Sequence, residues 1–509
     1  MKLLATEREA KLLAGKSFKM PHFGHLPDGA VAVASPVTML DAFYYDTADL
    51  ELARWGITLR HRVGGHEAPW TLKLPDGTVG QVLTRAELSF DGGPAKIPDE
   101  ARDLVRGFTR QKPLQIVAHL QTARVPLSVR DANGNQMLEI VDDTVTVLAD
   151  QAHSQFHEIE IEIEIETTTK NGSDRAALES AVSTLLAAGC RATRPLPKLV
   201  RALGPRAQVP PSVCITKIDR HASLADLIRH LTASSAVQLL THDPGVRLAR
   251  DSEAVHQYRV ATRRLRSDLR TFARFLDDDA TRQLREELRW LGGAVGPVRD
   301  LDVLGARFAT GVLQLAEVDQ RTAADLQVKL ATSRRLSQDA LLERLRSPRY
   351  DRTLEALIDY AAQPPIAAHE DRDANRPAIR FARGLVRHRW RQLDAAVTHV
   401  PGCATDEEFH RIRILAKRCR YAAEAVAPVV GRPASEFAAR VEGIQALLGD
   451  YHDTVVAEAW LRDAAVELVD ARVAIGGLIE IERQERDRLR TAWPTVWRHA
   501  SKRRARTWL

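Results

Sequence analysis

Residues 158–166 read Glu158-Ile-Glu160-Ile-Glu162-Ile-Glu164-Ile-Glu166, a strict alternation of acid and isoleucine. In a β-strand this alternation places every carboxylate on one face and every isoleucine on the other. Like charges two residues apart on a half-buried face are unfavourable unless metal ions or basic side chains neutralise them. The stretch therefore predicts either a strand with a solvated acidic face or a strand that lines a closed barrel holding a metal and a phosphate.

The chain is long enough for two or three domains, and its charge is unevenly divided. At 509 residues it exceeds the size of one typical hydrophobic core. Residues 1–200 carry 22 Lys and Arg against 26 Asp and Glu, whereas the remainder carries 51 against 41. A basic domain attracts polyanions such as nucleic acid, acidic membrane or a phosphate polymer, and clustered carboxylates suit a divalent metal.

Cysteine usage and the first residues indicate the compartment. The four cysteines, Cys190, Cys214, Cys403 and Cys419, are scattered and form no Cys-x-x-Cys pair, which favours a reduced, intracellular protein. The first residues contain acids where a signal peptide needs an apolar stretch, and no run approaches about 18 apolar residues. We therefore expect a cytoplasmic protein without a membrane segment.

Two kinds of periodicity divide the chain. Up to residue 200, short runs rich in Val, Ile, Leu and Thr alternate with turn signals such as Pro75-Asp-Gly77, which predicts mostly antiparallel β-structure. Helical interruptions are expected near Asp99–Phe108 and Asp174–Ala188. After a linker at 204–221, residues 222–509 have apolar residues at helical spacing, which predicts an all-α domain.

The helical part repeats itself. His256-Gln-Tyr-Arg259-Val-Ala-Thr-Arg263-Arg264-Leu-Arg266 returns as His410-Arg-Ile-Arg413-Ile-Leu-Ala-Lys417-Arg418-Cys-Arg420, with the histidine and four basic residues at the same offsets. Further on, Gly296-Pro-Val-Arg-Asp300 is matched by Gly449-Asp-Tyr-His-Asp453. The simplest explanation is a duplicated helical bundle, with copies near 222–362 and 378–500.

Each copy carries a basic stripe that starts at a histidine. The first stripe consists of residues three or four positions apart on one helix face, namely His256, Arg259, Arg263, Arg266 and Arg270. Like charges at this spacing repel, and a polyanion would offset the repulsion. A solvated helix surface, duplex nucleic acid and metal binding by His256 and His410 are the alternatives. However, the stripes have few aromatic residues for stacking on bases, and their surroundings are cationic rather than rich in carboxylates.

In the first 200 residues, charges of both signs recur on one face of strand after strand. They are Glu7, Glu9, Lys11, Arg60, Arg62, Lys73, Arg85, Glu87, Arg124, Arg130, Glu139 and Asp143, with Lys198 after the last helix. Singly, each pair is explained by a surface ion pair of little energetic value. Together they predict a lined interior, in which cations bind an anion of several phosphates and carboxylates bind one or two divalent metals.

With these motifs the chain resembles a CYTH domain, of the triphosphate tunnel metalloenzyme superfamily, joined to a CHAD domain, a helical module named for its histidines. The resemblance covers nearly the whole chain and rests on Glu7-x-Glu9-x-Lys11, Tyr44-Tyr-Asp-Thr47, Leu59-Arg-His-Arg62, Trp70-Thr-Leu-Lys73, the Glu158/Glu160/Glu162 strand and the two His-x-x-Arg helices. It implies an α+β multidomain protein. Residues 1–203 would form an eight-stranded antiparallel β-barrel tunnel with flanking helices, and residues 222–509 an all-α domain of two duplicated helical bundles.

The resemblance also implies roles for individual residues. Ligands of Mg²⁺ or Mn²⁺ would come from Glu7, Glu9, Glu139, Asp143, Glu158, Glu160 and Glu162. Phosphates would be clamped by Lys11, Arg60, Arg62, Lys73, Arg85, Arg124 and Lys198, to which the strand pattern adds Arg130. The expected catalytic residues are Glu7, Glu9, Lys11, Lys73 and Arg85. Polyphosphate would be bound by His256, Arg259, Arg263, Arg264, Arg266, His410, Arg413, Lys417 and Arg420.

Two features depart from the family pattern. The acidic alternation runs to Glu166 instead of ending after three acids, which leaves the strand register open by one pair, and Lys198 follows a proline where serine is common. The implied function is metal-dependent hydrolysis of inorganic triphosphate or polyphosphate ends in the barrel, with polyphosphate binding by the helical domain.

Three alternatives remain open. They are hydrolysis of thiamine triphosphate, cyclisation of ATP, and a non-catalytic polyphosphate-binding protein. We expect no specific nucleic-acid partner and no membrane. The expected location is the cytoplasm, including association with polyphosphate granules.

Overall fold

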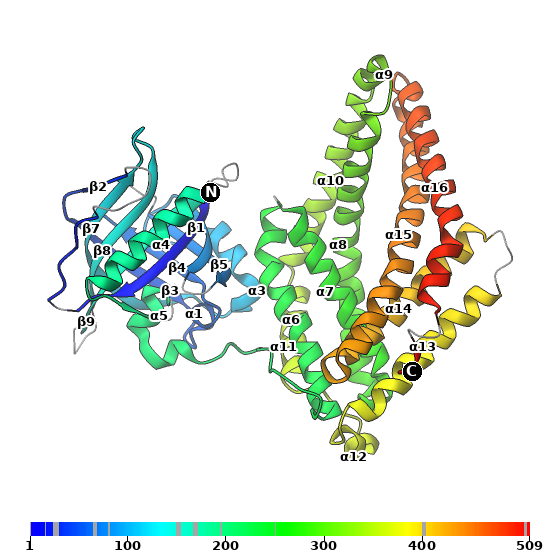
Figure 1. The fold of residues 1–509 in the computed structure, drawn as a ribbon, viewed down its shortest axis with the longest axis horizontal. Coiled ribbons are helices and arrows are strands. Elements are labelled where there is room, and N and C mark those ends of the chain that lie inside the picture. Colours follow the sequence, from blue (N-terminus) through cyan, green and yellow to red (C-terminus); the bar gives the residue numbers. More distant parts are fainter. Residues whose placement is uncertain are drawn as a thin grey trace. The chain divides into compact units, whose positions relative to one another are not determined.

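The computed structural model describes residues 2–15, 17–23, 30–64, 69–79, 82–148, 154–165, 172–193, 196–249, 251–399, 404–502 and 506–509. The chain divides into two compact units, Met1–Ser212 and Val213–Leu509, which we call the barrel unit and the helical unit (Figure 1). Two positions singled out in the sequence, Glu166 and Cys403, lie outside the described residues, as do the side chains of Glu7 and Glu164.

Eight antiparallel strands of the barrel unit close into a barrel in the order β1-β6-β5-β4-β3-β7-β8-β9, with β9 paired to β1. They are β1 (Lys2–Leu13), β3 (Thr38–Asp46), β4 (Thr58–Val63), β5 (Trp70–Val79), β6 (Val82–Phe90), β7 (Gln115–Arg130), β8 (Gln136–Leu148) and β9 (Ser154–Ile165). Two short strands, β2 (Val31–Ala34) and β10 (Arg191–Ala192), pair with β7 and β1. The expected eight-stranded antiparallel barrel is therefore confirmed.

Strand β9 contains the acidic alternation, and both of its faces are covered. Ile159, Ile161 and Ile163 are buried in a hydrophobic core with apolar residues of helix α4 (Gly172–Ala187), which lies across the outside of the barrel (Figure 1). On the opposite face, Glu158 and Glu160 are only 0 % and 3 % exposed. The interpretation of this run as a solvated acidic face is thus wrong for these two glutamates.

The pairing of β9 with β1 fixes the register that the sequence left open. Glu160 lies opposite Lys11, and Glu162 lies opposite Glu9. On its other side, β9 places Glu162 opposite Glu139 of β8. The charged faces of three neighbouring strands therefore point into the barrel together.

Short helices complete the barrel unit. They are α1 (Glu51–Arg54), α2 (Asp99–Leu104), α3 (Arg106–Thr109), α5 (Lys198–Leu203) and the 3-10 helix η2 (Gly204–Gln208). The helices expected near Asp99–Phe108 and Asp174–Ala188 correspond to α2, α3 and α4. Leu199 and Val200 of α5 are buried against residues of β3, β7 and β8, so α5 holds Lys198 at the barrel interior.

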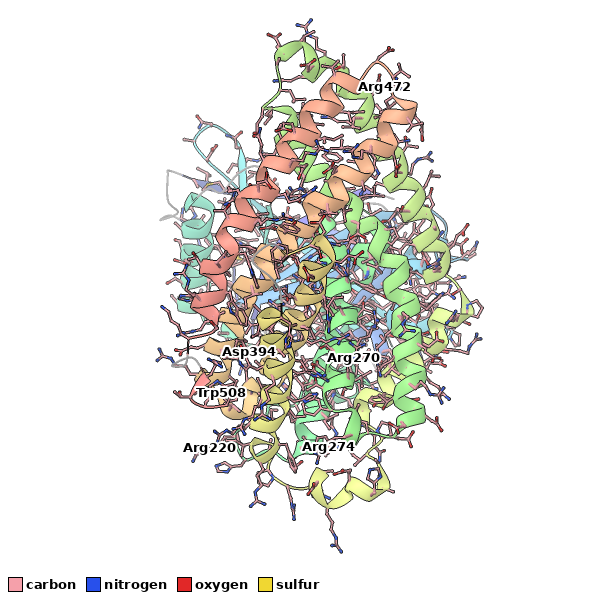
Figure 2. All side chains as sticks on the ribbon, turned by 90° about the vertical axis from the view of Figure 1, so that its right-hand side faces the viewer. Arg220, Arg270, Arg274, Asp394, Arg472 and Trp508 are labelled. Carbon is pink, nitrogen blue, oxygen red and sulfur yellow. The ribbon has the colours of Figure 1, made fainter. Side chains whose placement is uncertain are left out.

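The helical unit consists mainly of long helices, with two short helices between them. They are α6 (Leu224–Leu248), α7 (Ser252–Thr271), α8 (Asp278–Val312), α9 (Glu317–Thr322), α10 (Ala324–Leu345), α11 (Pro348–Ala362), α12 (Asp371–Ala374), α13 (Ile379–Thr398), α14 (Asp406–Val430), α15 (Arg432–Glu467) and α16 (Arg472–Ala500). Figure 2 labels Arg270 of α7 and Asp394 of α13 on the side of this unit that faces the viewer. Among the described helices, none has both the length and the apolar composition needed to cross a membrane.

The two basic stripes lie on α7 and α14, and these helices contact each other. Arg263 Nε of α7 donates a hydrogen bond to the Tyr421 hydroxyl of α14 at 2.7 Å, and Arg264 Nη2 lies 3.3 Å from Glu424 Oε2. Each of these helices is followed by a long helix, α8 or α15, many of whose apolar residues are buried. The duplicated motifs therefore meet in one structure instead of lying on separate surfaces.

Asp46 joins β3 to α1 through its buried carboxylate, which accepts hydrogen bonds from the backbone N–H groups of Thr47, Leu52 and Ala53 at 2.7, 2.9 and 2.8 Å. Replacing Asp46 by Ala would leave these donors without their partner. We expect the free energy of unfolding of the barrel unit to fall by about 2–4 kcal/mol. Hydrogen exchange of the α1 amides, followed by mass spectrometry, should become faster. The exposed Asp99→Ala is the control, and unchanged α1 protection in Asp46→Ala would contradict this role.

Candidate functional site

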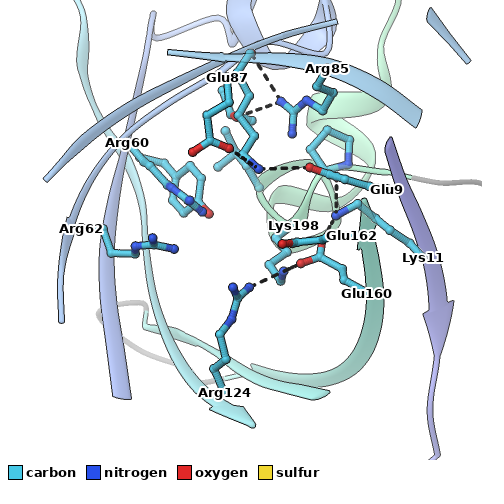
Figure 3. Close-up of a pocket in the computed structure, with 15 residues that line it drawn as sticks. Glu9, Lys11, Arg60, Arg62, Arg85, Glu87, Arg124, Glu160, Glu162 and Lys198 are labelled. Atoms are coloured by element: carbon cyan, nitrogen blue, oxygen red, sulfur yellow. Dashed lines mark hydrogen bonds and ion pairs between the residues drawn. The ribbon is translucent and has the colours of Figure 1, made fainter. Parts of the chain in front are cut away.

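The inward charges of the barrel surround a polar cavity (Figure 3). Seven of its lining side chains are basic and four are carboxylates, an excess of three positive charges. The lining consists of Glu9, Lys11, Tyr44, Thr58, Arg60, Arg62, Lys73, Arg85, Glu87, Arg124, Glu160, Glu162, Pro197, Lys198 and Leu199. These residues come from seven of the eight barrel strands and from α5 with its preceding residue. The cavity is thus suited to a small ligand with several negative charges.

One wall of the cavity is a chain of alternating acids and lysines (Figure 3). Lys73 Nζ lies 2.7 Å from Glu87 Oε2 and 3.1 Å from Glu9 Oε1. Lys11 Nζ lies 3.1 Å from Glu9 Oε2 and also pairs with Glu160. Because each lysine contacts two carboxylates, these buried charges are neutralised by one another.

Two further carboxylates lie behind this wall. Asp143 receives a two-pronged hydrogen bond from Arg124, at 3.0 Å from Nε and 2.8 Å from Nη2, and pairs with Lys198 at 2.9 Å. Glu158 Oε2 accepts a hydrogen bond from Arg201 Nε at 2.9 Å. Asp143 and Glu158 are fully buried and do not line the cavity. Their contacts position the cations that do line it, because Asp143 contacts both Arg124 and Lys198, and Glu158 contacts Arg201 of the same helix α5.

The pKa of Glu9 shows how strongly the lysine wall favours ionised carboxylates. Burial alone would raise this pKa, but the attraction of Lys11, Lys73 and Arg85 outweighs burial and holds the pKa well below its usual value. Burial also lowers the pKa of Lys11, against the opposing effect of Glu9 and Glu158. Glu9 and Lys11 therefore each favour the ionised form of the other.

The opposite wall is mainly cationic. Arg60 and Arg62 project from β4, and Arg124 projects from β7 (Figure 3). Burial, together with the positive charges of Arg60 and Arg124, lowers the pKa of Arg62 to about 9. Burial would raise the pKa of Tyr44, but Arg60 and Lys198 hold it below its usual value. An anion at this wall would relieve the repulsion among the three guanidinium groups.

The structure brings together most of the residues predicted to bind phosphate, with Arg130 as the exception. Arg130 is exposed at the end of β7, where Nη1 donates to the Gly134 carbonyl at 2.9 Å, and it does not line the cavity. Glu139 lies on β8 beside the lining residue Glu162 but is not itself part of the lining. Only the backbone of Glu7 is described, opposite Arg85 and Glu164.

Several lining or supporting residues were not assigned roles from the sequence. The sequence places Tyr44 and Glu87 in motifs but does not predict a role for either residue. Thr58 accepts a hydrogen bond from Arg85 Nη2 at 2.9 Å. Its uncharged side chain does not stand out in the charge pattern of the sequence. Arg201 was missed although it follows Lys198 by three residues. That spacing places two residues on one face of a helix and could have revealed it.

The donor chemistry of the cavity fits a hard divalent cation. Glu9, Glu160 and Glu162 present carboxylate oxygens, the ligands that Mg²⁺ and Mn²⁺ prefer. Within the described residues, no three His, Cys, Asp or Glu side chains are already gathered as a metal-binding group. The lysine contacts of Glu9 and Glu160 explain this arrangement, since Lys11 takes the place of a cation between them.

The helical unit has a second concentration of positive charge, where the stripes of α7 and α14 meet. Burial lowers the pKa of Arg413, with Arg263 and Arg259 adding to the effect across the helix pair. Burial and the same arginines lower the pKa of Lys417 to about 7. The stripe residues predicted separately in the two repeats, Arg259, Arg263, Arg413 and Lys417, thus form one electrostatic group.

The remaining predicted stripe residues have different surroundings. Arg264 and Arg420 both pair with Glu424, at 3.3 and 3.4 Å, and Arg420 also pairs with Glu442. The ring of His410 lies 4.8 Å from that of His452, between centroids. Burial, with Arg413 and the neighbouring His410, lowers the pKa of His452 to about 4. These histidines therefore stand in cationic rather than acidic surroundings.

Comparison with known proteins identifies two domain families in this chain. Residues 5–184 match the CYTH domain family and residues 231–462 match the CHAD domain family. Two uncharacterised proteins from strains of Mycobacterium tuberculosis are each 32% identical over 485 residues, which cover 90% of this chain and 89% of theirs.

Solved structures also resemble parts of the chain. PptA from Streptomyces chartreusis is 22% identical with a TM-score of 0.45, covering 54% of this chain and 100% of its own. The crystal structure of the CHAD domain from the plant Ricinus communis is 23% identical with a TM-score of 0.49, covering 58% of this chain and 96% of its own. From the two domain matches and the full-length relatives, the chain belongs to the family of proteins that join a CYTH domain to a CHAD domain.

Proposed function

We propose that the barrel hydrolyses a terminal phosphoanhydride bond of inorganic triphosphate or of a polyphosphate end, with Mg²⁺ or Mn²⁺, and that the helical unit binds polyphosphate. Both domain families relate to triphosphate or polyphosphate chemistry. The observation that carries the proposal is the cavity lining, in which seven basic side chains and four carboxylates converge from six strands and α5. A substrate with several adjacent phosphates matches the excess of basic side chains in this lining.

In this mechanism the protein binds, orients and neutralises, and no covalent nucleophile is required. Arg60, Arg62 and Arg124 hold the phosphate oxygens at the cationic wall, while Lys73 and Lys198 approach from the acidic wall. A divalent cation held by Glu9 and Glu160 or Glu162 would supply charge neutralisation at the phosphates and an activated water. Lys11 must then exchange its carboxylate partners for phosphate oxygens, which keeps its ammonium group neutralised.

Two further activities use the same cavity. Hydrolysis of thiamine triphosphate or cyclisation of ATP needs room for an organic group beyond the phosphates. A non-catalytic polyphosphate-binding protein needs only the helical unit. Release of phosphate by the purified protein, measured for triphosphate, ATP and thiamine triphosphate with Mg²⁺ or Mn²⁺, separates these functions. We expect turnover of triphosphate; no turnover of any substrate would exclude the enzyme, and turnover of ATP alone would exclude the preferred substrate.

The cationic wall provides the first test by mutation. Arg62→Gln removes a charged donor from the cavity, so we expect kcat/KM for triphosphate to fall about tenfold to a hundredfold, mainly through KM. Arg102→Gln is the matched control, because Arg102 is exposed on α2 and pairs only with Asp99 within the described residues. Equal kcat/KM in Arg62→Gln and Arg102→Gln would contradict phosphate binding at this wall.

The helical stripes provide the second test. Replacing Arg259, Arg263, Arg413 and Lys417 together by Ala should weaken binding of long-chain polyphosphate, because it removes the charges shared by α7 and α14. Triphosphate hydrolysis should stay largely intact, since no residue of the barrel changes. Affinity is measured at physiological salt by fluorescence anisotropy, with duplex DNA as the competing ligand. Unchanged polyphosphate affinity would rule out the stripes, and equally strong DNA binding would favour a nucleic-acid function.

A pH dependence follows from Lys417. Because its pKa is lowered to about 7 by burial and by Arg413, Arg263 and Arg259, against the attraction of Asp453, the free protein loses this charge above neutral pH. A bound polyanion favours the protonated form, so polyphosphate affinity should fall as pH rises above 7, by up to about tenfold per pH unit.

The change Lys417→Met tests this pH dependence, because it removes the titrating group and should flatten the affinity profile between about pH 7 and pH 9. In this range histidine with an ordinary or lowered pKa is mostly neutral. Circular dichroism checks that the variant keeps its helices. Parallel pH profiles for the wild type and Lys417→Met would show that Lys417 does not take up a proton on binding.

A further inference from the structure

The two ends of the stripe on α7 have different electrostatic surroundings. At the end near His256, Arg259 Nη1 lies 2.6 Å from Asp300 Oδ1 of α8. At the equivalent place in the second repeat, Asp453 of α15 attracts Arg413. Asp300 and Asp453 occupy matching positions of the duplicated sequence. The stripe therefore carries its own counter-ions at this end, once in each repeat.

The other end of the stripe is a cluster of arginines from four helices. Arg266 and Arg270 of α7 interact electrostatically there with Arg285 and Arg289 of α8, Arg389 of α13 and Arg418 of α14, and we call these six residues the six-arginine cluster. Within the part of the chain that the structure describes, none of the six forms an ion pair with a carboxylate. Arg389 Nη1 donates to Gln392 Oε1 at 3.3 Å, and its Nη2 donates to the Arg270 carbonyl at 3.2 Å.

The repulsion inside this cluster appears in the pKa values of its members. Burial lowers the pKa of Arg270 to about 10, with Arg418, Arg285, Arg266 and Arg389 adding to the effect. The same causes, burial and neighbouring arginines, lower the pKa of Arg266. An anion placed here relieves repulsion without displacing an internal partner. At the other end, a phosphate must compete with Asp300 and Asp453 for the arginines it contacts.

The two ends are far apart compared with a short phosphate ligand. From Arg259 to Arg270 the axis of α7 rises by about 16 Å at about 1.5 Å per residue. A triphosphate, with three phosphorus atoms, cannot contact both ends at once. A polyanion that uses the whole stripe must therefore be a longer chain.

We propose that a polyphosphate chain binds primarily at the six-arginine cluster, and that Asp300 and Asp453 act as internal counter-ions that weaken its binding at the histidine end. This inference rests on the proposed polyphosphate function of the helical unit. The two ends of the surface then differ in affinity for polyphosphate. The six-arginine cluster binds the chain strongly, and the histidine end binds it weakly because Asp300 and Asp453 compete for its arginines. It also identifies two acidic residues whose removal should improve binding.

Three pairs of substitutions test the proposal, with fluorescence anisotropy of end-labelled long-chain polyphosphate on the full-length protein. Arg270→Gln with Arg389→Gln should weaken binding about tenfold or more, since two charged contacts are lost. Arg259→Gln with Arg413→Gln should weaken it less, because these arginines are already neutralised in part. Asp300→Asn with Asp453→Asn should strengthen binding severalfold.

Two controls make the comparison specific. Glu317→Gln with Glu467→Gln also removes two negative charges, but from exposed sites on α9 and at the end of α15. This pair should leave the affinity for polyphosphate nearly unchanged. If loss of the Arg389 hydrogen bond to the end of α7 unfolds the first pair, Arg285→Gln with Arg289→Gln replaces it. The salt dependence of affinity should also decrease, by roughly 0.7 in log–log slope per lost contact, as for single-stranded nucleic acid.

The outcomes separate this inference from the function on which it rests. If the wild type does not bind long-chain polyphosphate, the proposed function of the helical unit fails, and the inference fails with it. If the wild type binds but the Arg270/Arg389 pair has no larger effect than the Arg259/Arg413 pair, the inference alone is wrong. Unchanged or weaker binding by the Asp300/Asp453 pair would likewise overturn it. Tighter binding of duplex DNA at the same salt concentration would assign the cluster to nucleic acid instead.

Discussion

The neutralisation of buried charge between β1 and β9 is the interaction on which the barrel depends. Lys11 and Glu160 are almost completely buried, and each contacts opposite charges, Lys11 with Glu9 and Glu160, and Glu160 with Lys11 and Lys198. The barrel closes by bringing together two strands that would each be unstable alone. A consequence is that a ligand does not enter an empty space. It enters a network of ion pairs and must offer charges that replace those it separates.

In the helical unit, by contrast, basic side chains gather without enough carboxylates to neutralise them. Its arginines come together from both repeats, and where carboxylates are present, as at Arg259, they neutralise only part of the charge. Tyr421 lies under this surface and accepts a hydrogen bond from Arg263, so the duplicated helices share a polar as well as an apolar contact. An enclosed, largely compensated cavity suits a small ligand, and an open, uncompensated surface suits a long one. Under the proposed function, one protein would use both kinds of site, the cavity and the surface, to bind phosphate polymers.

The sequence predicted the barrel and its charged interior because a strand repeats every two residues and a lined interior must follow that repeat. The same rule could not separate residues that line the cavity from those behind it, since Asp143 and Glu158 obey the alternation as well as Glu160 does. Arg130 also follows the alternation, but it lies at the end of β7, where β7 pairs with β8 and with β2 in place of β3. The six-arginine cluster was not predictable, since Arg285 and Arg389 belong to helices without a stripe and meet Arg270 only through tertiary packing.

The repeated Glu-Ile dipeptide of β9 has one more consequence. A slip of one residue would turn the isoleucines into the cavity and is strongly disfavoured, but a slip of two residues presents the same faces to β1 and α4. The strand therefore specifies its orientation without specifying its position. Contacts from outside the repeat remove this degeneracy, namely Arg201 with Glu158 and Lys198 with Glu160. Both cations belong to α5, so docking of this late segment of the chain favours one alignment of the barrel over the shifted one.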